Sequence, residues 1–398
     1  MAAKGDQGTV RALNSRLILR LLREEGPVSR SDLAGRTGLS NGAVTRIVGE
    51  LIDEGLLVEQ SVGVSTGGRR PVLLDLDTST WVVAGLKLMD DAILAVLVDL
   101  KGSVVADRRF ALRSQTTNTV LERAATAVET LLYSADVPRE RLAGIGLCMP
   151  GAVDWRSGIC RLSPSFGWRG VRVADLLRER VGVPVSVDNN VNALAAAESL
   201  FGRGRRERDF AVITVGRGVG AGFVHNGVVY RGYSGGAGEF GHQVSELGGR
   251  RCECGKDGCL EAYIGDHGLL QRVRELGGRF RQLDLDGFLE LARVGDRQAE
   301  RLYADVVSRL GVAIANLVNL LSPRLVILGG EASLVSERLL SDLREPIDAH
   351  VFGGLSGSFA LEIDDWRSDR TAWARGAASL AMEHVFDPLL RSPGVAIA

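Results

Sequence analysis

A short segment rich in cysteine constrains this chain more than any other feature. Residues 239–261 read EFGHQVSELGGRRCECGKDGCLE and contain His242, Cys252, Cys254 and Cys259. One imidazole and three thiolates form the donor set of a closed, tetrahedral structural zinc site. The chain has five cysteines, an odd number, which favours metal binding in a reducing compartment over a disulfide framework. The sequence therefore predicts a structural Zn²⁺ site in this segment.

Two carboxylates, Glu239 and Glu261, bracket the same segment. Carboxylates beside a metal site are held rigidly, so the segment is predicted both to bind a metal and to aim polar groups at a ligand. The competing interpretation is that both are ordinary surface charges. Of the two other cysteines, Cys148 lies in an apolar run and is expected to be a small buried hydrophobic residue.

Length and composition indicate a globular protein of several domains. A chain of 398 residues suggests roughly two or three domains, and its formal net charge of −1 points to no particular partner. No apolar signal region follows Lys4, and no run of about 18 apolar residues occurs. We therefore expect a cytoplasmic protein without a membrane partner.

The amino-terminal residues have the pattern of a helix-turn-helix. Apolar residues recur at helical spacing from Val10 to Leu22, and Gly26-Pro27 ends this first helix. Ser31 is predicted to cap a short second helix, Gly38 to make a tight turn, and Ser40 to cap a third helix. The inner face of that third helix is formed by Val44, Ile47, Val48 and Leu51.

A winged hairpin is predicted to follow this helical module. The segment LLVEQ at 56–60 is followed by SVGVSTGGRRPVLLDLD at 61–77, which gives a glycine-rich tip between two apolar β-like runs. Such a tip can bring arginines to phosphates or to a narrow minor groove, while the start of the third helix faces the major groove. The alternative is a module that binds protein. The residues predicted to contact DNA are Ser40, Asn41, Thr45, Arg46, Arg69 and Arg70.

The rest of the chain alternates strands with helices. A β-hairpin over Val82–Leu100, with a turn at Met89-Asp90-Asp91, opens this part. A glycine loop at 216–220 is as consistent with a tight hairpin as with a phosphate cradle. The alternation and its repetition predict a mixed α/β fold of two lobes with a cleft between them. The segments concerned are Val120–Leu132, Leu142–Met149, Val183–Val187, Phe210–Val215, Ala221–Val224, Leu302–Leu321 and Leu325–Leu328.

Taken together, the motifs resemble those of the ROK family of sugar kinases and sugar-responsive repressors. The resemblance covers nearly the whole chain, and the cysteine pattern is its most specific part. The amino-terminal module is what distinguishes the family's repressors. The matching motifs are GEFGH at 238–242, CECGKDGCLE at 252–261, DNNVN at 188–192 and GGRRP at 67–71.

The resemblance implies a winged helix-turn-helix over residues 1–78 followed by a two-lobed, actin-like (ribonuclease-H-like) sugar kinase fold. The first lobe would span 79–190, completed by a carboxyl-terminal helix at about 372–386, and the second lobe, with the zinc motif, would span 191–371. The family forms dimers or tetramers. Carried over by motif, the sugar contacts would be Gly151, Asn189, Asn190, Glu239, His242 and Glu261. For Asp188 and Asn192, a turn or capping role explains the residue type as well as a ligand role does.

Three positions depart from the family's kinases. The kinases have an Asp as general base where Asn190 stands, and an amide cannot remove the proton of a sugar hydroxyl. Lys87 and Met89-Asp90-Asp91 replace an Asp and a Gly-Gly-Thr turn that surround the nucleotide phosphates. Arg217 replaces a threonine between glycines, and an arginine there could either bind phosphate or fill the site. We therefore expect that kinase activity is lost and that ATP is not a cofactor.

These inferences predict a sugar-responsive transcriptional regulator, most simply a repressor, that binds operator DNA through the winged helix. The effector would be a sugar bound in the cleft between the lobes. Two alternatives stay open: an ATP-dependent sugar kinase with residual activity, and a sugar-binding protein without a DNA function.

Overall fold

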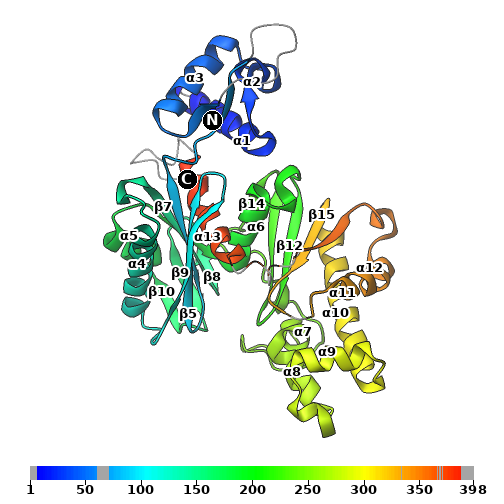
Figure 1. Cartoon of the computed structure of the whole chain (residues 1–398). Coiled ribbons are helices and arrows are strands. Elements are labelled where there is room, and N and C mark those ends of the chain that lie inside the picture. Colours follow the sequence, from blue (N-terminus) through cyan, green and yellow to red (C-terminus); the bar gives the residue numbers. More distant parts are fainter. Residues whose placement is uncertain are drawn as a thin grey trace. The chain divides into compact units, whose positions relative to one another are not determined.

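The computed structural model describes residues 7–60, 71–332, 334–364, 366, 369 and 371–386 (Figure 1). The chain forms two compact units. The first holds residues through Arg206 together with those from Trp373 onward, and the second holds Glu207 to Ala372. Helix α6 (Asn190–Leu200) therefore belongs to the first unit, whereas the sequence prediction divides the lobes after residue 190.

The amino-terminal module is a helix-turn-helix with a small sheet of order β1-β3-β2. Gly38 adopts φ 71° and ends α2, and Ser40 caps α3 by accepting from the Ala43 amide at 3.2 Å, as predicted. Its elements are α1 (Gln7–Glu25), β1 (Val28–Ser29), α2 (Arg30–Thr37), α3 (Asn41–Asp53), β2 (Leu57–Gln60) and β3 (Leu73–Leu76). The four predicted inner-face residues of α3 are all buried.

One predicted cap was wrong. Helix α2 begins at Arg30, so its cap is Ser29, whose Oγ accepts from the Asp32 amide at 3.2 Å. Ser31 lies inside the first turn, where its hydroxyl is 2.9 Å from that of Ser29. The physical reason is that Ser29 has the extended backbone that a cap requires, at φ −76° and ψ 159°.

The first lobe contains a five-stranded sheet of order β11-β7-β4-β5-β6. Strands β4, β5 and β6 are antiparallel, and β7 and β11 extend the sheet in parallel. The strands are β4 (Val82–Leu88), β5 (Ala92–Asp99), β6 (Val104–Ala111), β7 (Leu142–Met149) and β11 (Val185–Asn189). A second sheet has the order β10-β9-β8, from β8 (Ala152–Asp154), β9 (Ile159–Ser163) and β10 (Trp168–Val171).

Helices cover both faces of the five-stranded sheet. The apolar residues of α4 (Thr117–Ser134) and α5 (Val173–Val181) form one core with the sheet. On the other face, residues of α13 (Ala372–Val385), of the sheet and of the helix-turn-helix module join a second core. A short 3₁₀ helix, η1 (Arg139–Arg141), precedes β7, and η2 (Arg203–Arg206) follows α6.

Helix α13 lies unusually close to the sheet. A Cβ atom on Gly146 of β7 would lie 1.7 Å from the carbonyl oxygen of Ala377, and one on Gly85 of β4 would lie 1.9 Å from that of Ala374. No side chain fits at these distances. The two glycines are therefore what allows a helix from the far end of the chain to pack on the sheet.

The second lobe repeats the same strand plan, in the order β14-β13-β12-β15-β16. Three antiparallel strands come first, and two parallel strands extend the sheet on the β12 side. The strands are β12 (Phe210–Val215), β13 (Val219–His225), β14 (Val228–Tyr230), β15 (Leu325–Gly329) and β16 (Ala360–Asp364). The predicted mixed α/β fold is confirmed by the two sheets of matching order.

The helices of the second lobe are mostly inserted before β15. They are η3 (Phe240–His242), α7 (Glu261–Ile264), α8 (Asp266–Glu275), η4 (Gly278–Gln282), α9 (Leu285–Arg293), α10 (Arg297–Leu321), α11 (Glu337–Asp342), α12 (Arg344–His350) and η5 (Gly353–Leu355). Within the described ranges, α10 alone is long and apolar enough to cross a membrane. Its buried stripe, which includes Val306, Leu310 and Ile314, lies in the core of this lobe, so α10 has the placement of a core helix.

Candidate metal, ligand and DNA sites

The structure brings the four predicted metal ligands together. The ligand atoms of His242, Cys252, Cys254 and Cys259 all lie within 4.8 Å of one another. The sulfurs of Cys254 and Cys259 are 3.7 Å apart, and the Cys252 sulfur is 3.7 Å from Nδ1 of His242. A tetrahedral zinc with bonds of about 2.3 Å has edges of roughly 3.7 Å, so the donor set and its spacing fit this metal.

Tight backbone turns place the cysteines. The Cys252 amide donates to the carbonyl of Lys256 at 2.8 Å, and the Gly255 amide donates back to that of Cys252 at 3.0 Å. Gly258 has φ 81°, and a Cβ atom there would lie 1.8 Å from the Glu246 carbonyl oxygen. This segment can therefore fold back on itself only with glycine at 258.

Contacts to α8 and α10 hold the metal-binding segment in place. The Tyr263 hydroxyl accepts from the Arg250 amide at 2.8 Å, and the guanidinium of Arg309 in α10 lies 3.9 Å from the Tyr263 ring centroid. Arg309 also pairs with Glu246 at 2.8 Å. On the other side, Arg250 pairs with Glu275 of α8 at 2.6 Å. The segment is thus tied to α8 through Arg250 and to α10 through Arg309.

The cysteine thiols differ in acidity before any metal binds. Burial raises the pKa of Cys252 to about 12. For Cys254, burial opposes ionisation, but the Lys256 amide and the neighbouring thiols outweigh it and lower the pKa. Thiolates are the metal-binding form, so metal binding has to displace the Cys252 proton.

Glu239 and Glu261 both lie close to His242, one of the four candidate metal ligands. While Nδ1 of His242 faces the cysteines, its Nε2 is 3.7 Å from a Glu239 oxygen. A ligating histidine is commonly oriented by a carboxylate in this way. Glu261 is fixed differently, because its Oε2 accepts from the Val219 amide of β13 at 2.8 Å. Glu239 remains half exposed, at 51%, and is accessible to a ligand.

The other three predicted sugar contacts lie together in the first lobe. Asn189 caps α6 by accepting from the Val191 amide at 2.8 Å, and its Nδ2 donates to the Gly151 carbonyl at 2.9 Å. Gly151 has φ 109°, and a Cβ atom there would lie 2.3 Å from the Leu162 carbonyl oxygen. Asn189 therefore fixes the Gly151 loop in addition to any contact with a ligand.

Asn190 differs from Asn189 in having an unused acceptor. Its Oδ1 is buried and has no hydrogen-bond partner among the described residues. A buried acceptor without a donor costs about 1–3 kcal/mol, so a ligand hydroxyl that donates to it is favoured. By contrast, Asp188 Oδ1 accepts from the Asn189 amide at 2.7 Å and from Nδ2 of Asn192 at 2.9 Å, so Asp188 and Asn192 hold the start of α6 through internal hydrogen bonds, while Asn189 is the cap.

Two serines that the sequence did not single out belong to the same region. The hydroxyls of Ser163 and Ser165 are buried, and no described residue bonds to them. The Cα of Ser163 lies 2.9 Å from the position that a Cβ on Gly151 would take. Ser163 ends β9 and Ser165 lies in the turn that follows; their sequence, SPS, is no motif, and only their burial without partners among the described residues marks them as candidate ligand contacts.

The positions that depart from the kinase pattern are occupied by internal contacts. Lys87 is buried, and its Nζ lies 4.1 Å from the centroid of the Trp373 ring. In the turn before β5, Asp91 pairs with Arg109 at 2.5 Å. The Gly216 amide donates to the Gly218 carbonyl at 3.1 Å, so the loop that carries Arg217 is a tight hairpin between β12 and β13.

The predicted DNA contacts of α3 are on its exposed side. Asn41, Thr45 and Arg46 are exposed, and Ser40 is exposed while it caps the helix. The Thr45 hydroxyl donates to the Asn41 carbonyl at 2.8 Å. Arg69 and Arg70 of the predicted wing lie outside the described residues. The first turns of α3 thus present two polar side chains and one cation on a helix whose other face is buried.

Known protein families and relatives match both parts of this chain. Residues 83–384 match the ROK family, and residues 12–58 match a winged helix-turn-helix DNA-binding domain. The xylose repressor of Bacillus subtilis (strain 168) is 28% identical over 382 residues, which cover 96% of this chain and 98% of the relative. The DNA-binding transcriptional dual regulator NagC of Escherichia coli (strain K12) is 31% identical over 351 residues, or 86% of each chain.

Solved structures of a transcriptional regulator and of a hexokinase are similar to this chain. A ROK family transcriptional regulator, described as a homologue of the Escherichia coli MLC protein, superposes with a TM-score of 0.84 at 26% identity, covering 96% of this chain and 98% of the other. A ROK hexokinase from Thermus thermophilus has a TM-score of 0.67 at 31% identity and covers 77% of this chain and 99% of its own. From the match over residues 83–384 we conclude that the chain belongs to the ROK family.

Proposed function

We propose that this protein is a sugar-responsive transcriptional repressor that binds operator DNA through α3 and the wing and no longer phosphorylates the sugar. It acts in the cytoplasm as a symmetric dimer or tetramer, with Zn²⁺ in a structural role. The match of residues 12–58 to a DNA-binding domain, and the relatives named as a xylose repressor and as a DNA-binding transcriptional dual regulator, support the DNA function. The observation that most supports the sugar function is the buried Oδ1 of Asn190, to which no group of the described residues donates a hydrogen bond.

Asn190 suits binding and not catalysis. An amide accepts a hydrogen bond from a sugar hydroxyl through its oxygen and donates one through its nitrogen. It has no pKa that would let it act as general base. The neighbouring capped backbone, held by Asn189 and Asp188, fixes this side chain at the start of α6. Rigid placement is what allows a site to distinguish the stereochemistry of hydroxyl groups.

The DNA function predicts a large effect of Arg46→Ala. Each specific base contact contributes about 1–3 kcal/mol, so operator affinity should fall by roughly 5- to 150-fold. Mobility shifts with the protein's own upstream region and with random DNA, at two salt concentrations, measure this. Arg169→Ala is the matched control, since Arg169 is an exposed arginine in β10, away from the DNA-binding module. Equal affinity of the wild type for both DNAs would refute the repressor function.

The sugar function predicts a ligand among common hexoses and pentoses. A ligand at 100 times its dissociation constant stabilises the protein by about 2.7 kcal/mol, which a thermal-shift screen detects. Asn190→Ala should abolish most of that shift, and Glu239→Gln should reduce it. Asn118→Ala, at an exposed asparagine in α4, should leave it unchanged. A sugar shift that persists in Asn190→Ala would show that this residue is not a contact.

Loss of kinase activity is tested with ATP and the same sugars. Since the missing base alone costs on the order of 10²–10⁴-fold in rate, we expect no turnover by the wild type in a coupled assay. Asn190→Asp supplies a carboxylate but leaves Lys87 and Asp91 in place, so it should restore little. Robust wild-type turnover would establish the sugar kinase alternative instead.

A further inference from the structure

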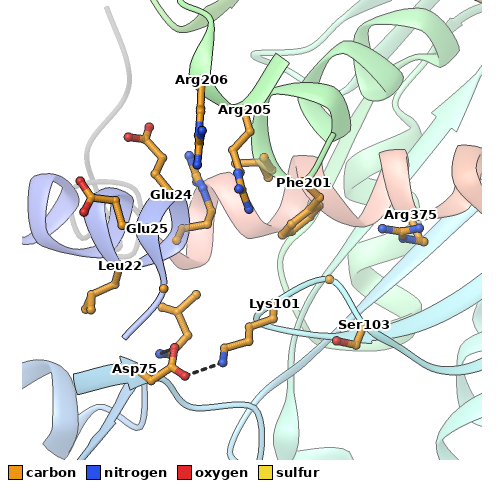
Figure 2. Close-up of a pocket in the computed structure, with 15 residues that line it drawn as sticks. Leu22, Glu24, Glu25, Asp75, Lys101, Ser103, Phe201, Arg205, Arg206 and Arg375 are labelled. Carbon is orange, nitrogen blue, oxygen red and sulfur yellow. Dashed lines mark hydrogen bonds and ion pairs between the residues drawn. The ribbon is translucent and has the colours of Figure 1, made fainter. Parts of the chain in front are cut away.

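A cavity that the proposed function does not use lies between the DNA-binding module and the first lobe, which belong to one compact unit. Its volume is about 490 Å³, and it lies among the end of α1, strand β3, the β5–β6 turn, the α6–η2 connection and α13. Figure 2 shows Arg205 and Arg206 above the end of α1, with Lys101 and Arg375 on other walls. Arg23 of α1 also lines it. Five cations from four separate parts of the chain therefore meet here.

The acidic groups of the lining are already neutralised. Glu24 pairs with Arg20 at 2.5 Å, and Glu25 pairs with Arg36. Asp75 is buried and pairs with Lys101 at 2.6 Å, as Figure 2 also shows. In the described parts of the chain, no carboxylate forms an ion pair with any of three lining arginines, Arg23, Arg205 and Arg206.

Arg23 is the most constrained of these cations. Its Nε is buried, and no described group accepts a hydrogen bond from it. Burial lowers the pKa of Arg23 to about 10, against the opposing effect of Glu24 and the lesser one of Glu383. A buried guanidinium with a free donor is costly, and an anion that accepts its hydrogen bond relieves that cost.

We propose that this cavity is a second ligand site, which binds a dianionic phosphate group, either as inorganic phosphate or as a small phosphate monoester. Guanidinium groups match phosphate oxygens in two-pronged hydrogen bonds, and three of them around one cavity suit a double negative charge. The volume lies within the range of small-molecule sites and leaves room beyond the phosphate group itself.

Helix α6 connects the predicted sugar contacts to this cavity, so an anion bound in the cavity could affect regulation. This helix of 11 residues begins beside Asn189 and Asn190 and runs into Phe201 and η2 at the cavity wall. At 1.5 Å per residue it spans roughly 16 Å. An anion held by both Arg23 and Arg206 would link the DNA-binding module to the far end of the helix that starts at the predicted sugar contacts. This coupling rests on the proposed function, whereas the binding itself does not.

Isothermal titration calorimetry of the full-length protein tests the binding, with inorganic phosphate and glycerol 3-phosphate as probes. Sodium chloride at matched ionic strength controls for screening. We expect saturable binding at one site per chain, weakened at least about tenfold in the double variant Arg205→Gln/Arg206→Gln by loss of charge-assisted hydrogen bonds. Arg169→Gln should bind as the wild type does. Tighter binding of the monoester identifies a metabolite as ligand, and equal binding identifies free phosphate.

Absence of saturable heat would overturn the proposal, as would unchanged affinity in a double variant whose melting temperature matches the wild type. A variant that melts earlier is replaced by Arg206→Lys, which keeps the charge and should weaken binding less than Arg206→Gln. Neither DNA nor sugar is present in the titration, so its failure is distinct from failure of the repressor function. Mobility shifts with and without phosphate, at constant ionic strength, then measure the coupling; an operator affinity that phosphate leaves unchanged would refute it.

Discussion

Cys252→Ser is expected to remove the metal and to destabilise the second lobe. The wild type should contain about one zinc per chain, and the variant close to none, because a closed site needs all four ligands. We expect the free energy of unfolding to fall by at least about 3 kcal/mol, since loss of a structural metal is among the largest single-site effects. Metal analysis of the native protein and thermal melts with and without a chelator measure both quantities.

The contacts of the metal-binding segment explain the size of the expected effect. Cys252 and Cys259 are buried, and Tyr263 and Phe240 of the same region join the core of the second lobe. Release of the metal would leave buried thiols without their ligand role and loosen the attachment to α10. Cys148→Ala is the matched control, because it removes a buried cysteine of the first lobe and should leave the zinc content unchanged. A wild-type protein that is metal-free, folded and responsive to sugar would refute the zinc assignment.

Gly146→Ala is expected to destabilise the first lobe by about 3 kcal/mol or more. The added methyl group would lie 1.7 Å from the Ala377 carbonyl oxygen, and backbone cannot move aside as a flexible side chain can. Helix α13 would have to separate from the sheet, which disturbs a core that the helix shares with the DNA-binding module. Denaturant unfolding followed by far-ultraviolet circular dichroism gives the free energy of unfolding.

Gly144→Ala is the matched control for this prediction. Gly144 lies in the same strand, but an added Cβ there would be 3.4 Å from the nearest atom, the Pro184 carbonyl oxygen. The loss of stability should therefore be much smaller, within about 1 kcal/mol. Similar losses in both variants would show that β7 is sensitive to any substitution and that the contact with α13 is not the cause.

Sequence patterns predicted the buried strands well and the edge strands poorly. Strands β7 and β12 have the predicted bounds, because unbroken apolar runs between turn residues are typical of central strands. Strand β6, with the sequence VVADRRFA, lies at the sheet edge and is largely exposed. It therefore has no continuous apolar run from which a strand could be predicted. The three short strands β8, β9 and β10 give no stronger signal, for they contain three to five residues each.

The candidate sites also divide into residues that a local motif predicted and residues that only the structure revealed. Residue type and spacing predicted the four candidate metal ligands, and the structure brings their ligand atoms together. The motif around Asn190 located a candidate ligand contact, but only the structure shows that its oxygen is buried without a partner while that of Asn189 caps a helix. Ser163 and the cavity arginines belong to no sequence motif, because their candidate roles in ligand binding depend on neighbours that are distant in sequence.

The sequence by itself determined those features whose parts lie within one short segment: the candidate metal ligands of 242–259, the turn at Gly38 between two helices, and the hairpin that opens the first lobe. Such features follow from local backbone preference and side-chain chemistry. Only the tertiary structure decided which distant segments meet. Cys148 donates to the carbonyl of Trp373 at 3.7 Å although 225 positions separate them, and Arg23 reaches a cavity lined by Arg206. These contacts depend on how closely whole elements pack, as at Gly146, and no local pattern encodes that distance.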